Sequence, residues 1–192
     1  MKIVNSSYKI LGSINGAAML RAIEVAGRTC YKSEGAITAT SAEKFLRDVI
    51  MLKGHESVLE HQSISVRVIC DRGVSHEIVR HRLASYSQES TRYCNYASGK
   101  FGGELTFIRP PFVWSDIMMR TWEEAMRSAE SCYLLMIAHF ATPQEARSVL
   151  PNSLKTEIII TMNLREWRHF FSFALCAFCP SADAGTIGTP AG

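Results

Sequence analysis

Residues 62–70 carry the clearest strand pattern in the chain, because isoleucine and valine alternate with polar residues from Ile64 to Val68. Such alternation places apolar side chains on one face of a sheet and is typical of a half-buried β-strand. Further strands are expected over 153–162 and, with a looser alternation, over 2–11. Strands are therefore expected near both ends of the sequence and in its middle, with long segments of other structure between them.

The segments between these strands show helical periodicity and capping residues. Asn15 is expected to cap a helix that runs through Cys30, and Ser41 to open a second helix. The inner side of that second helix is expected to carry Phe45, Leu46, Val49, Ile50 and Leu52. Later helices are expected at about 74–83, from Ser115 to about Phe140, from Thr142 to Val149 and over Leu164–Leu175, with a polar stretch from 84 to about 104.

The composition is that of an ordinary globular protein. The 192 residues are 47% hydrophobic and 20% charged, and the net charge of +3 is too small to indicate nucleic-acid binding by charge alone. No apolar run reaches the roughly 18 to 20 residues that span a membrane, and the N-terminus does not resemble a secretory signal. We therefore expect a cytoplasmic protein with a single domain over 1–179. The tail 180–192, rich in proline, glycine and alanine, is expected to be disordered.

The six cysteines are scattered along the chain, which favours reduced thiols over a disulfide framework. Cys176 and Cys179 have C-x-x-C spacing, but a zinc site needs a second pair of ligands. His169 is the nearest further candidate in the sequence. We favour the interpretation that both cysteines are small apolar side chains in a helix, and we expect no metal site.

The densest polar cluster spans residues 72–92, and its centre is the run Arg80-His81-Arg82. On a helix the two arginines would point about 200° apart, so they would serve two ligands, or one ligand and a partner subunit. Glu77 lies one turn before this run and could orient its first arginine. The hydroxyl-rich stretch that follows ends in another arginine, a combination that can bind phosphate. Spacing alone favours a ligand site and a solvated polar surface about equally.

His55 and His61 lie just upstream in the run His-Glu-Ser-Val-Leu-Glu-His. A zinc hydrolase helix needs histidines four residues apart, so that both imidazoles share one face. These two are six residues apart, which places them out of phase on a helix. The sequence therefore argues against a zinc hydrolase.

Four segments of this chain occur in the same order in one known family. Arg80-His81-Arg82, followed after seven residues by Ser90, matches the R-H-R-x7-S signature of the flavin-dependent thymidylate synthases. The run His55–His61 resembles the family's upstream segment, and residues 73–79 resemble its lead-in to the signature. Residues 163–171 resemble its closing helix, so the resemblance extends from the first strand to about residue 171.

The resemblance implies a fold and an activity. Members of this family make dTMP from dUMP with methylenetetrahydrofolate as one-carbon donor, NADPH as reductant and FAD as hydride carrier. Their fold is an α/β domain with a curved, mostly antiparallel sheet flanked by helices. They assemble as homotetramers with active sites at the subunit interfaces. Their reaction uses no cysteine nucleophile, which agrees with the absence of cysteine between Arg72 and Arg92.

The resemblance also implies roles for individual residues. FAD contacts are expected at Ser57, Arg80, His81, Arg82, Gln88, Asn163, Leu164, Arg165 and His169. One subunit is expected to contact dUMP through Glu77, Ile78, Val79 and Arg80, and another through Gln88, Glu89, Ser90, Thr91 and Arg92, with Arg147 as a further contact. Catalytic roles are implied for Arg80, Arg82 and Ser90. An arginine beside the flavin pyrimidine can stabilise negative charge on the reduced ring.

The sequence departs from the family near its C-terminus. The arginine that usually contacts the uracil and favours its ionisation falls at Ala174, which has no guanidinium group. The family's next helix is replaced by the short segment 180–192. These departures raise an alternative, a catalytically impaired homologue that binds FAD and nucleotide.

A nucleic-acid-binding domain is a further alternative from another class of protein. It would use the arginines of residues 72–92 as a basic patch. Only Tyr86 and Tyr93 are interleaved with them, which is too little for a base-stacking platform. This alternative is therefore the least favoured.

Overall fold

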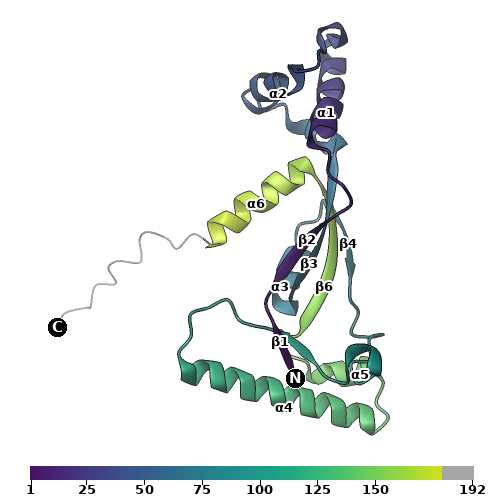
Figure 1. Ribbon diagram of the computed structural model, residues 1–192, viewed down its shortest axis with the longest axis vertical. Coiled ribbons are helices and arrows are strands. Elements are labelled where there is room, and N and C mark those ends of the chain that lie inside the picture. The colour runs from purple at the N-terminus through teal and green to yellow at the C-terminus, as the bar shows by residue number, and fades with distance from the viewer. Residues whose placement is uncertain (179–192) are drawn as a thin grey trace, which may run out of the picture. The chain divides into compact units, whose positions relative to one another are not determined.

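The computed structural model describes the backbone of residues 1–178 and the side chains of residues 1–172. The chain folds into two compact units (Figure 1). Unit 1 comprises residues 1–14 and 64–161, and unit 2 comprises residues 15–63 and 162–178 of the described chain. The expected single domain over 1–179 stays a prediction. The tail 180–192 and Cys179 lie outside the described residues.

Unit 1 is built on a four-stranded sheet with the order β2-β3-β6-β4. These strands are β2 (Ser7–Leu11), β3 (Ser63–Asp71), β6 (Lys155–Asn163) and β4 (Ala84–Gln88). β2 and β3 run antiparallel, with Tyr8 opposite Val68. A separate parallel pair joins β1 (Lys2–Val4) to β5 (Thr106–Ile108). The antiparallel sheet accompanied by helices confirms the predicted mixed fold class.

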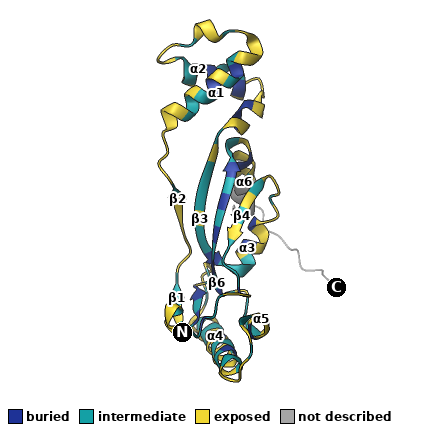
Figure 2. Ribbon diagram, turned by 90° about the vertical axis from the view of Figure 1, so that its right-hand side faces the viewer, coloured by how far each residue is buried: buried dark blue, intermediate teal, exposed yellow. Residues whose placement is uncertain are grey.

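Burial along β6 follows the alternation of its side chains. Thr156, Ile158, Ile160 and Met162 are each at most 1% exposed, whereas the residues between them are partly exposed (Figure 2). Successive side chains of a strand point to opposite faces, so one face of β6 is fully buried. Removing apolar surface from water stabilises the fold by about 25 cal/mol per Å².

The helices of unit 1 begin at side chains that accept backbone N–H groups. They are α3 (Arg72–Ile78), α4 (Asp116–Ala138) and α5 (Pro143–Ala146), with short 3₁₀ segments η4 (Gly99–Phe101) and η5 (Arg147–Val149). Asp71 caps α3, Ser115 caps α4, and Thr142 forms a capping box with Glu145. The core of this unit contains Tyr96, Leu105, Phe107, Met126, Tyr133, Ala146 and Leu154.

Unit 2 is helical around a small apolar core. It contains α1 (Gly16–Tyr31), α2 (Ser41–Phe45) and α6 (Leu164–Phe178), together with the π-helix η2 (Leu46–Met51) and the 3₁₀ helices η1 (Glu34–Ala36) and η3 (Glu56–His61). Asn15 caps α1 as predicted, through a 3.0 Å bond from the Ala18 N–H. The core residues are Ile23, Phe45, Ile50, Val58 and Leu59. Among residues 1–178, no helix combines the length and apolar character needed to cross a membrane.

Several predicted elements differ from the observed ones. The strand expected over 2–11 is two strands, because β1 pairs with β5 while β2 pairs with β3. α2 does begin at Ser41 as predicted, but its N-cap is Thr40, and the Ser41 hydroxyl accepts the N–H of Thr38. Leu52, expected on the inner side of this helix, is 77% exposed. The expected polar stretch after residue 84 contains β4.

Candidate active site

The run Arg80-His81-Arg82 lies in a turn after α3 and not on a helix. The Arg80 N–H donates to Glu77 O at 3.1 Å, and the His81 N–H donates to Ile78 O at 3.2 Å. The prediction of a helix through residue 83 is therefore wrong, and the 200° separation of the two arginines has no basis. Arg80 and Arg82 are both exposed.

Tyr86 holds this turn, and sequence reasoning missed that role. Its hydroxyl lies 2.9 Å from the carbonyl oxygen of Ile78 and 2.6 Å from that of His81. Tyr86 belongs to β4, so these bonds connect the strand to the end of α3. Glu77 is exposed and makes no ion pair with Arg80 within the described residues, so the orienting role suggested for it is not observed.

Gln88, predicted to contact both FAD and dUMP, joins three elements of unit 1. Its side-chain nitrogen donates to Ser75 Oγ at 2.8 Å and to Thr156 Oγ1 at 3.2 Å. Ser75 and Thr156 are both completely buried, and Ser75 donates in turn to the carbonyl oxygen of Arg72 at 2.9 Å. The two N–H groups of Gln88 are therefore occupied, which leaves its carbonyl oxygen as the group available to a ligand.

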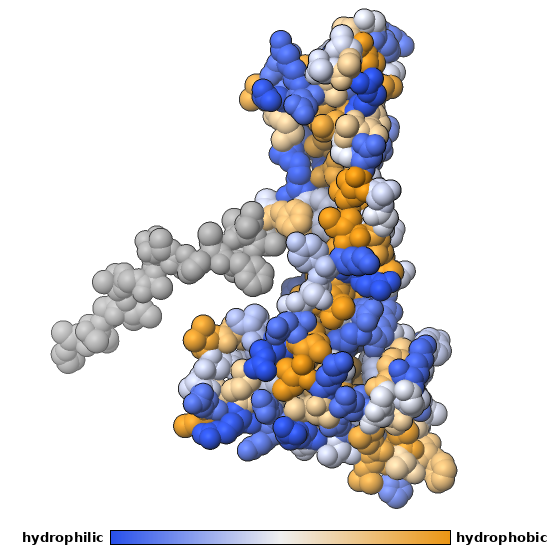
Figure 3. All heavy atoms as spheres, in the orientation of Figure 1, coloured by the Kyte–Doolittle hydropathy of each residue, from blue (hydrophilic) through white to orange (hydrophobic). Residues whose placement is uncertain are grey.

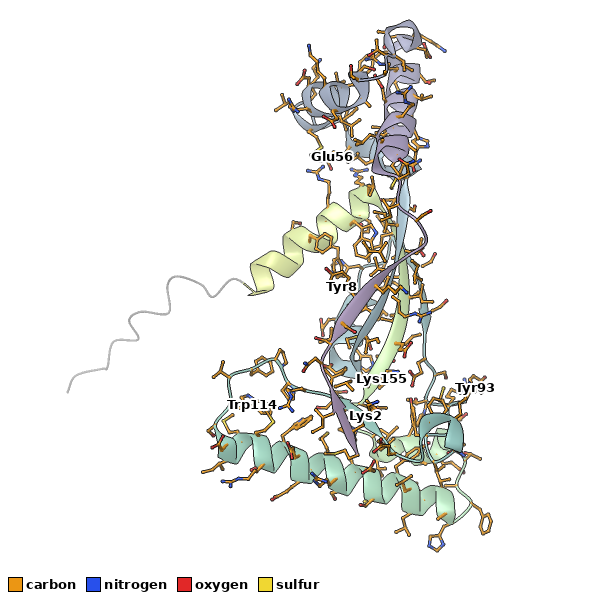
Figure 4. The ribbon with its side chains drawn as sticks, in the orientation of Figure 1. Lys2, Tyr8, Glu56, Tyr93, Trp114 and Lys155 are labelled. Atoms are coloured by element: carbon orange, nitrogen blue, oxygen red, sulfur yellow. The ribbon has the colours of Figure 1, made fainter. Side chains whose placement is uncertain are left out.

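Glu89 is held by charged and hydroxyl groups. The Tyr96 hydroxyl donates to Glu89 Oε1 at 2.6 Å, and Lys155, labelled on β6 in Figure 4, donates to Glu89 Oε2 at 3.0 Å. Lys155 also pairs with Glu157 at 2.7 Å. Burial by itself would lower the pKa of Lys155, but its hydrogen bonds to Glu157 and Glu89 outweigh burial and raise it. Both carboxylate oxygens of Glu89 are engaged, so its side chain anchors the segment that follows it.

That segment, Ser90 to Arg92, is the predicted phosphate site. Ser90 Oγ accepts the Arg92 N–H at 3.3 Å, and Thr91 is only 5% exposed. Arg92 itself is exposed, and its Nε donates to Gln144 of α5 at 3.1 Å. Arg147, the further dUMP contact, directly follows α5 and is also exposed. The structure thus brings Arg92 beside the helix that leads into Arg147.

In unit 2, Ser57 and Arg165 line the same cavity, which has a volume of about 310 Å³. His55, Tyr31 and Cys30 also line it. The Tyr31 hydroxyl is hydrogen-bonded to His55 Nδ1, and the two rings stack with centroids 6.1 Å apart. A hydroxyl, a guanidinium and aromatic walls are groups that a nucleotide cofactor can use. Two of the residues predicted to contact FAD therefore line one cavity, and their role toward FAD stays a prediction.

Ion pairs connect α6 to η3 at the edge of this cavity. Arg165 Nη1 lies 2.6 Å from Glu60 Oε1, and Arg168 Nη1 lies 2.6 Å from Glu56 Oε1. Glu56 is labelled in Figure 4. Both pairs are partly exposed, so water screens them and each adds little to stability. Their effect on the site is to hold the first turns of α6 against η3.

The remaining predicted FAD residues of unit 2 lie at the start of α6. Asn163 Oδ1 accepts the Glu166 N–H at 2.8 Å and so caps the helix. Leu164 packs against the core of the unit, and its N–H donates to Gln62 O at 2.9 Å. His169 is exposed on α6. Ala174 lies within α6, but its side chain is outside the described residues.

The predicted FAD residues divide between the two units. Ser57, Asn163, Leu164, Arg165 and His169 belong to unit 2, and Arg80, His81, Arg82 and Gln88 belong to unit 1. Within unit 1 the predicted dUMP residues lie on consecutive segments, from the end of α3 through β4 to the turn at Arg92. Sequence reasoning missed the residues that hold these segments, above all Tyr86, Tyr96 and Lys155.

Comparison with known proteins identifies the family of the chain. The sequence model of the family described as thymidylate synthase complementing protein matches residues 16–182. The match extends beyond residue 171, so the expectation that the resemblance ends there is wrong. A solved structure of the UMP/dUMP methylase PolB from Streptomyces cacaoi, bound with 5-Br dUMP, has a TM-score of 0.73 at 22% identity. The matched region covers 90% of this chain and 79% of the PolB chain, and the similarity shows a shared fold.

Curated relatives give a closer sequence match. The flavin-dependent thymidylate synthase of Geobacter sulfurreducens is 38% identical over 163 residues, which cover 81% of this chain and 68% of the relative. The Pyrococcus furiosus protein of the same name is 36% identical over 176 residues, covering 91% of this chain and 70% of the relative. On the family match and these two relatives, the chain belongs to the thymidylate synthase complementing protein family.

Proposed function

We propose that this chain is a flavin-dependent thymidylate synthase, a methyltransferase that converts dUMP to dTMP. Methylenetetrahydrofolate is the one-carbon donor and NADPH is the reductant, and bound FAD supplies the hydride-carrying chemistry. The observation that carries the proposal is the R-H-R-x7-S run, Arg80 to Ser90, in a chain that matches the family over residues 16–182. The curated relatives bear the name of the active enzyme, which favours this function over the impaired homologue.

The proposal assigns FAD contacts to residues of each unit. In unit 2, Ser57 and Arg165 would bind the cofactor at the 310 Å³ cavity, with Asn163, Leu164 and His169 at the start of α6. In unit 1, the proposal assigns FAD contacts to Arg80, His81, Arg82 and Gln88. The exposed guanidinium groups of Arg80 and Arg82 can stabilise negative charge that develops on a bound ring system, because preorganised donors cost little reorganisation during the reaction.

The dUMP site of the proposal has two halves from different subunits. Glu77, Ile78, Val79 and Arg80 form one half, and Gln88 to Arg92 form the other, with Arg147 as a further contact. Arg92 and Ser90 suit the phosphate, because an arginine fork beside a hydroxyl can make charge-assisted hydrogen bonds to it. The anchored Glu89 side chain supports this role, since it fixes the backbone that leads into Ser90.

A homotetramer with interfacial active sites is part of the proposal. Apolar side chains are exposed over the sheet of unit 1 (Figure 3), and on edge strand β2 Tyr8 is 77% and Ile10 45% exposed. Exposed apolar side chains on an edge strand favour association. Light scattering should give a mass near four times 21.4 kDa, and Tyr8→Lys should lower it. A wild-type mass of 21.4 kDa would contradict this assembly.

The function is tested by Arg92→Ala. We expect dUMP binding to weaken by at least about tenfold, because a charge-assisted hydrogen bond to phosphate is lost, while FAD binding changes by less than about twofold. Titrations with dUMP by calorimetry and with FAD by visible absorbance measure the two affinities. Arg120→Ala, which removes an exposed arginine on α4, is the matched control.

Equal losses of dUMP and FAD affinity in Arg92→Ala would contradict the assignment of the phosphate site. The activity itself is measured by tritium release from labelled dUMP, and by bleaching of the flavin spectrum on anaerobic addition of NADPH. A protein that binds no FAD even at excess cofactor would overturn the proposed function.

A further inference from the structure

Unit 2 contains a second cavity, of about 430 Å³, that none of the residues assigned to FAD or dUMP lines. It lies where the C-terminal end of α1 meets α2 and η2. Its charged lining consists of Arg28, Lys44 and Lys53 against a single acid, Asp48. The volume is within the range of about 300 to 1,000 Å³ that is usual for small-molecule sites. The excess of positive charge selects an anionic ligand.

Arg28 is held in a defined position within this cavity. Its Nε donates to Glu24 Oε1 at 2.7 Å, and its guanidinium carbon lies 4.7 Å from the centre of the Phe45 ring. Its side chain is 12% exposed, and that of Glu24 is completely buried. Its Nη1 lies 3.5 Å from the carbonyl oxygen of Ser33, and its Nη2 has no hydrogen-bond partner among the described residues. A rigid arginine with free donors is suited to phosphate, because little side-chain entropy remains to be lost on binding.

The two lysines of the lining carry charge that the described residues do not neutralise. Neither Lys44 nor Lys53 forms a salt bridge within the part of the chain that the structure describes, and both are exposed. Ser33 and Ser41 also line the cavity and bring hydroxyl groups to it. Ammonium and hydroxyl groups around one arginine match the several acceptor oxygens of a phosphomonoester.

Tyr31 connects this cavity to the predicted flavin site, because it lines both. Its side chain is 47% exposed, and its hydroxyl binds His55 in the 310 Å³ cavity. A ligand in the larger cavity would therefore lie next to a molecule bound in the smaller one. The reductant of the proposed reaction has to reach the flavin, and it carries a phosphomonoester at its adenosine end.

We propose that the cavity of Arg28, Lys44 and Lys53 binds the phosphorylated adenosine end of NADPH. This inference rests on the proposed function, which supplies the identity of the reductant. The lysines and arginine contact the 2′-phosphate, and the Tyr31 ring offers an aromatic surface to the base. The site therefore selects NADPH over NADH, which lacks this phosphate.

The test uses adenosine 2′,5′-bisphosphate as a probe, titrated by calorimetry into the FAD-loaded full chain. Lys44→Gln and Lys53→Gln should each weaken its binding about fivefold to tenfold, because each removes one charge-assisted contact. Arg47→Gln is the matched control, since Arg47 is an exposed cation of the same helical region that does not line the cavity. It should change the affinity by less than about twofold.

Two further titrations show whether the cavity recognises a phosphorylated adenosine or any anion. Inorganic phosphate should bind much more weakly than the probe, and a folate should not compete with it. Equal weakening by Arg47→Gln, or no weakening by either lysine variant, would overturn the proposal. So would inorganic phosphate binding as tightly as the probe, because the site would then be a general anion site.

Failure of this inference can be separated from failure of the proposed function. If the wild-type chain binds FAD and forms dTMP while Lys44→Gln and Lys53→Gln keep the wild-type KM for NADPH, only the cavity assignment fails. If the chain binds no FAD, the proposed function fails. Titrating the probe into the chain without FAD then still decides whether the cavity binds a phosphorylated adenosine.

Discussion

Individual cysteines differ in chemical character because of burial. Cys70 is 3% exposed, and burial, together with the charge of Asp71, raises the pKa of its thiol to about 11. Cys30 and Cys132 are exposed, and all three are free thiols. The sequence predicted reduced cysteines but could not rank their reactivity, because burial depends on which elements pack together.

These differences predict a pattern of alkylation. At pH 8 an alkylating reagent should modify Cys30 and Cys132 readily and Cys70 at least about tenfold more slowly, because the thiolate is the reactive species. FAD should slow modification of Cys30, which lines the 310 Å³ cavity, and leave Cys132 on α4 as the control. Peptide mass spectrometry over time measures each rate. Protection of both cysteines to the same extent, or of neither, would argue against FAD binding in that cavity.

Several predicted ligand residues also have structural partners that the sequence could not reveal. Gln88 and Thr156 lie 68 residues apart, and Glu89 and Lys155 lie 66 apart. A pattern within a short window carries no information on contacts at such separation. The sequence therefore predicted Gln88 and Glu89 as site residues by resemblance but missed the side chains that fix them.

At the scale of elements, the packing of α1 against α2 depends on a glycine. Gly27 is buried within α1, and a Cβ atom there would lie 2.6 Å from Cε1 of Phe45. Because Phe45 belongs to the apolar core and is 7% exposed, its ring has little room to move. The two helices can approach this closely only with glycine at this position.

We therefore expect Gly27→Ala to destabilise the protein by about 1–3 kcal/mol through overpacking. The better helix propensity of alanine, about 1 kcal/mol, offsets only part of this cost. Gly16→Ala is the matched control, because nothing lies within 4 Å of a Cβ at that first position of α1. Urea unfolding followed by circular dichroism measures both variants. A Gly27→Ala protein as stable as the Gly16→Ala protein would show that Phe45 can move aside.

The position of β4 limits the length of α3. The sequence predicted a helix to residue 83, but α3 ends at Ile78 and β4 begins at Ala84. β4 pairs with β6, and its Tyr86 binds the carbonyl oxygens of Ile78 and His81. These bonds replace the helical hydrogen bonds that a longer α3 would have made.

At the scale of the whole molecule, global stability should fall at alkaline pH. The folded-state pKa of Lys155 is raised by its bonds to Glu157 and Glu89, despite burial. A raised lysine pKa contributes stability that is fully present below the unfolded value of about 10.4 and is lost as pH rises through the folded value. Burial, together with the hydrogen bond to Glu89, also raises the pKa of Tyr96, so this tyrosine too contributes stability that is lost as pH rises above its unfolded value.

The corresponding experiment follows the free energy of unfolding in urea from pH 8 to 11.5. The free energy of unfolding of the wild-type protein should decline above about pH 10. That of Lys155→Met should decline less steeply, because methionine has no proton to lose. Lys100→Met, which replaces an exposed lysine of the same unit, is expected to keep the wild-type slope. Identical slopes for all three proteins would mean that the Lys155 network does not contribute to global stability.

The sequence by itself determined the features that depend on short windows. The caps at Asn15, Ser115 and Thr142 bind N–H groups three residues away, and the alternation in β3 and β6 needs only neighbouring residues. The family also followed from the sequence, because its signature is a contiguous run. Tertiary structure alone decided where α3 ends, that β4 forms in a polar stretch, and which groups surround Glu89 and line the basic cavity of Lys44. Each of these results from contacts between segments distant in sequence, whose free energy exceeds the weak local preferences that a sequence pattern records.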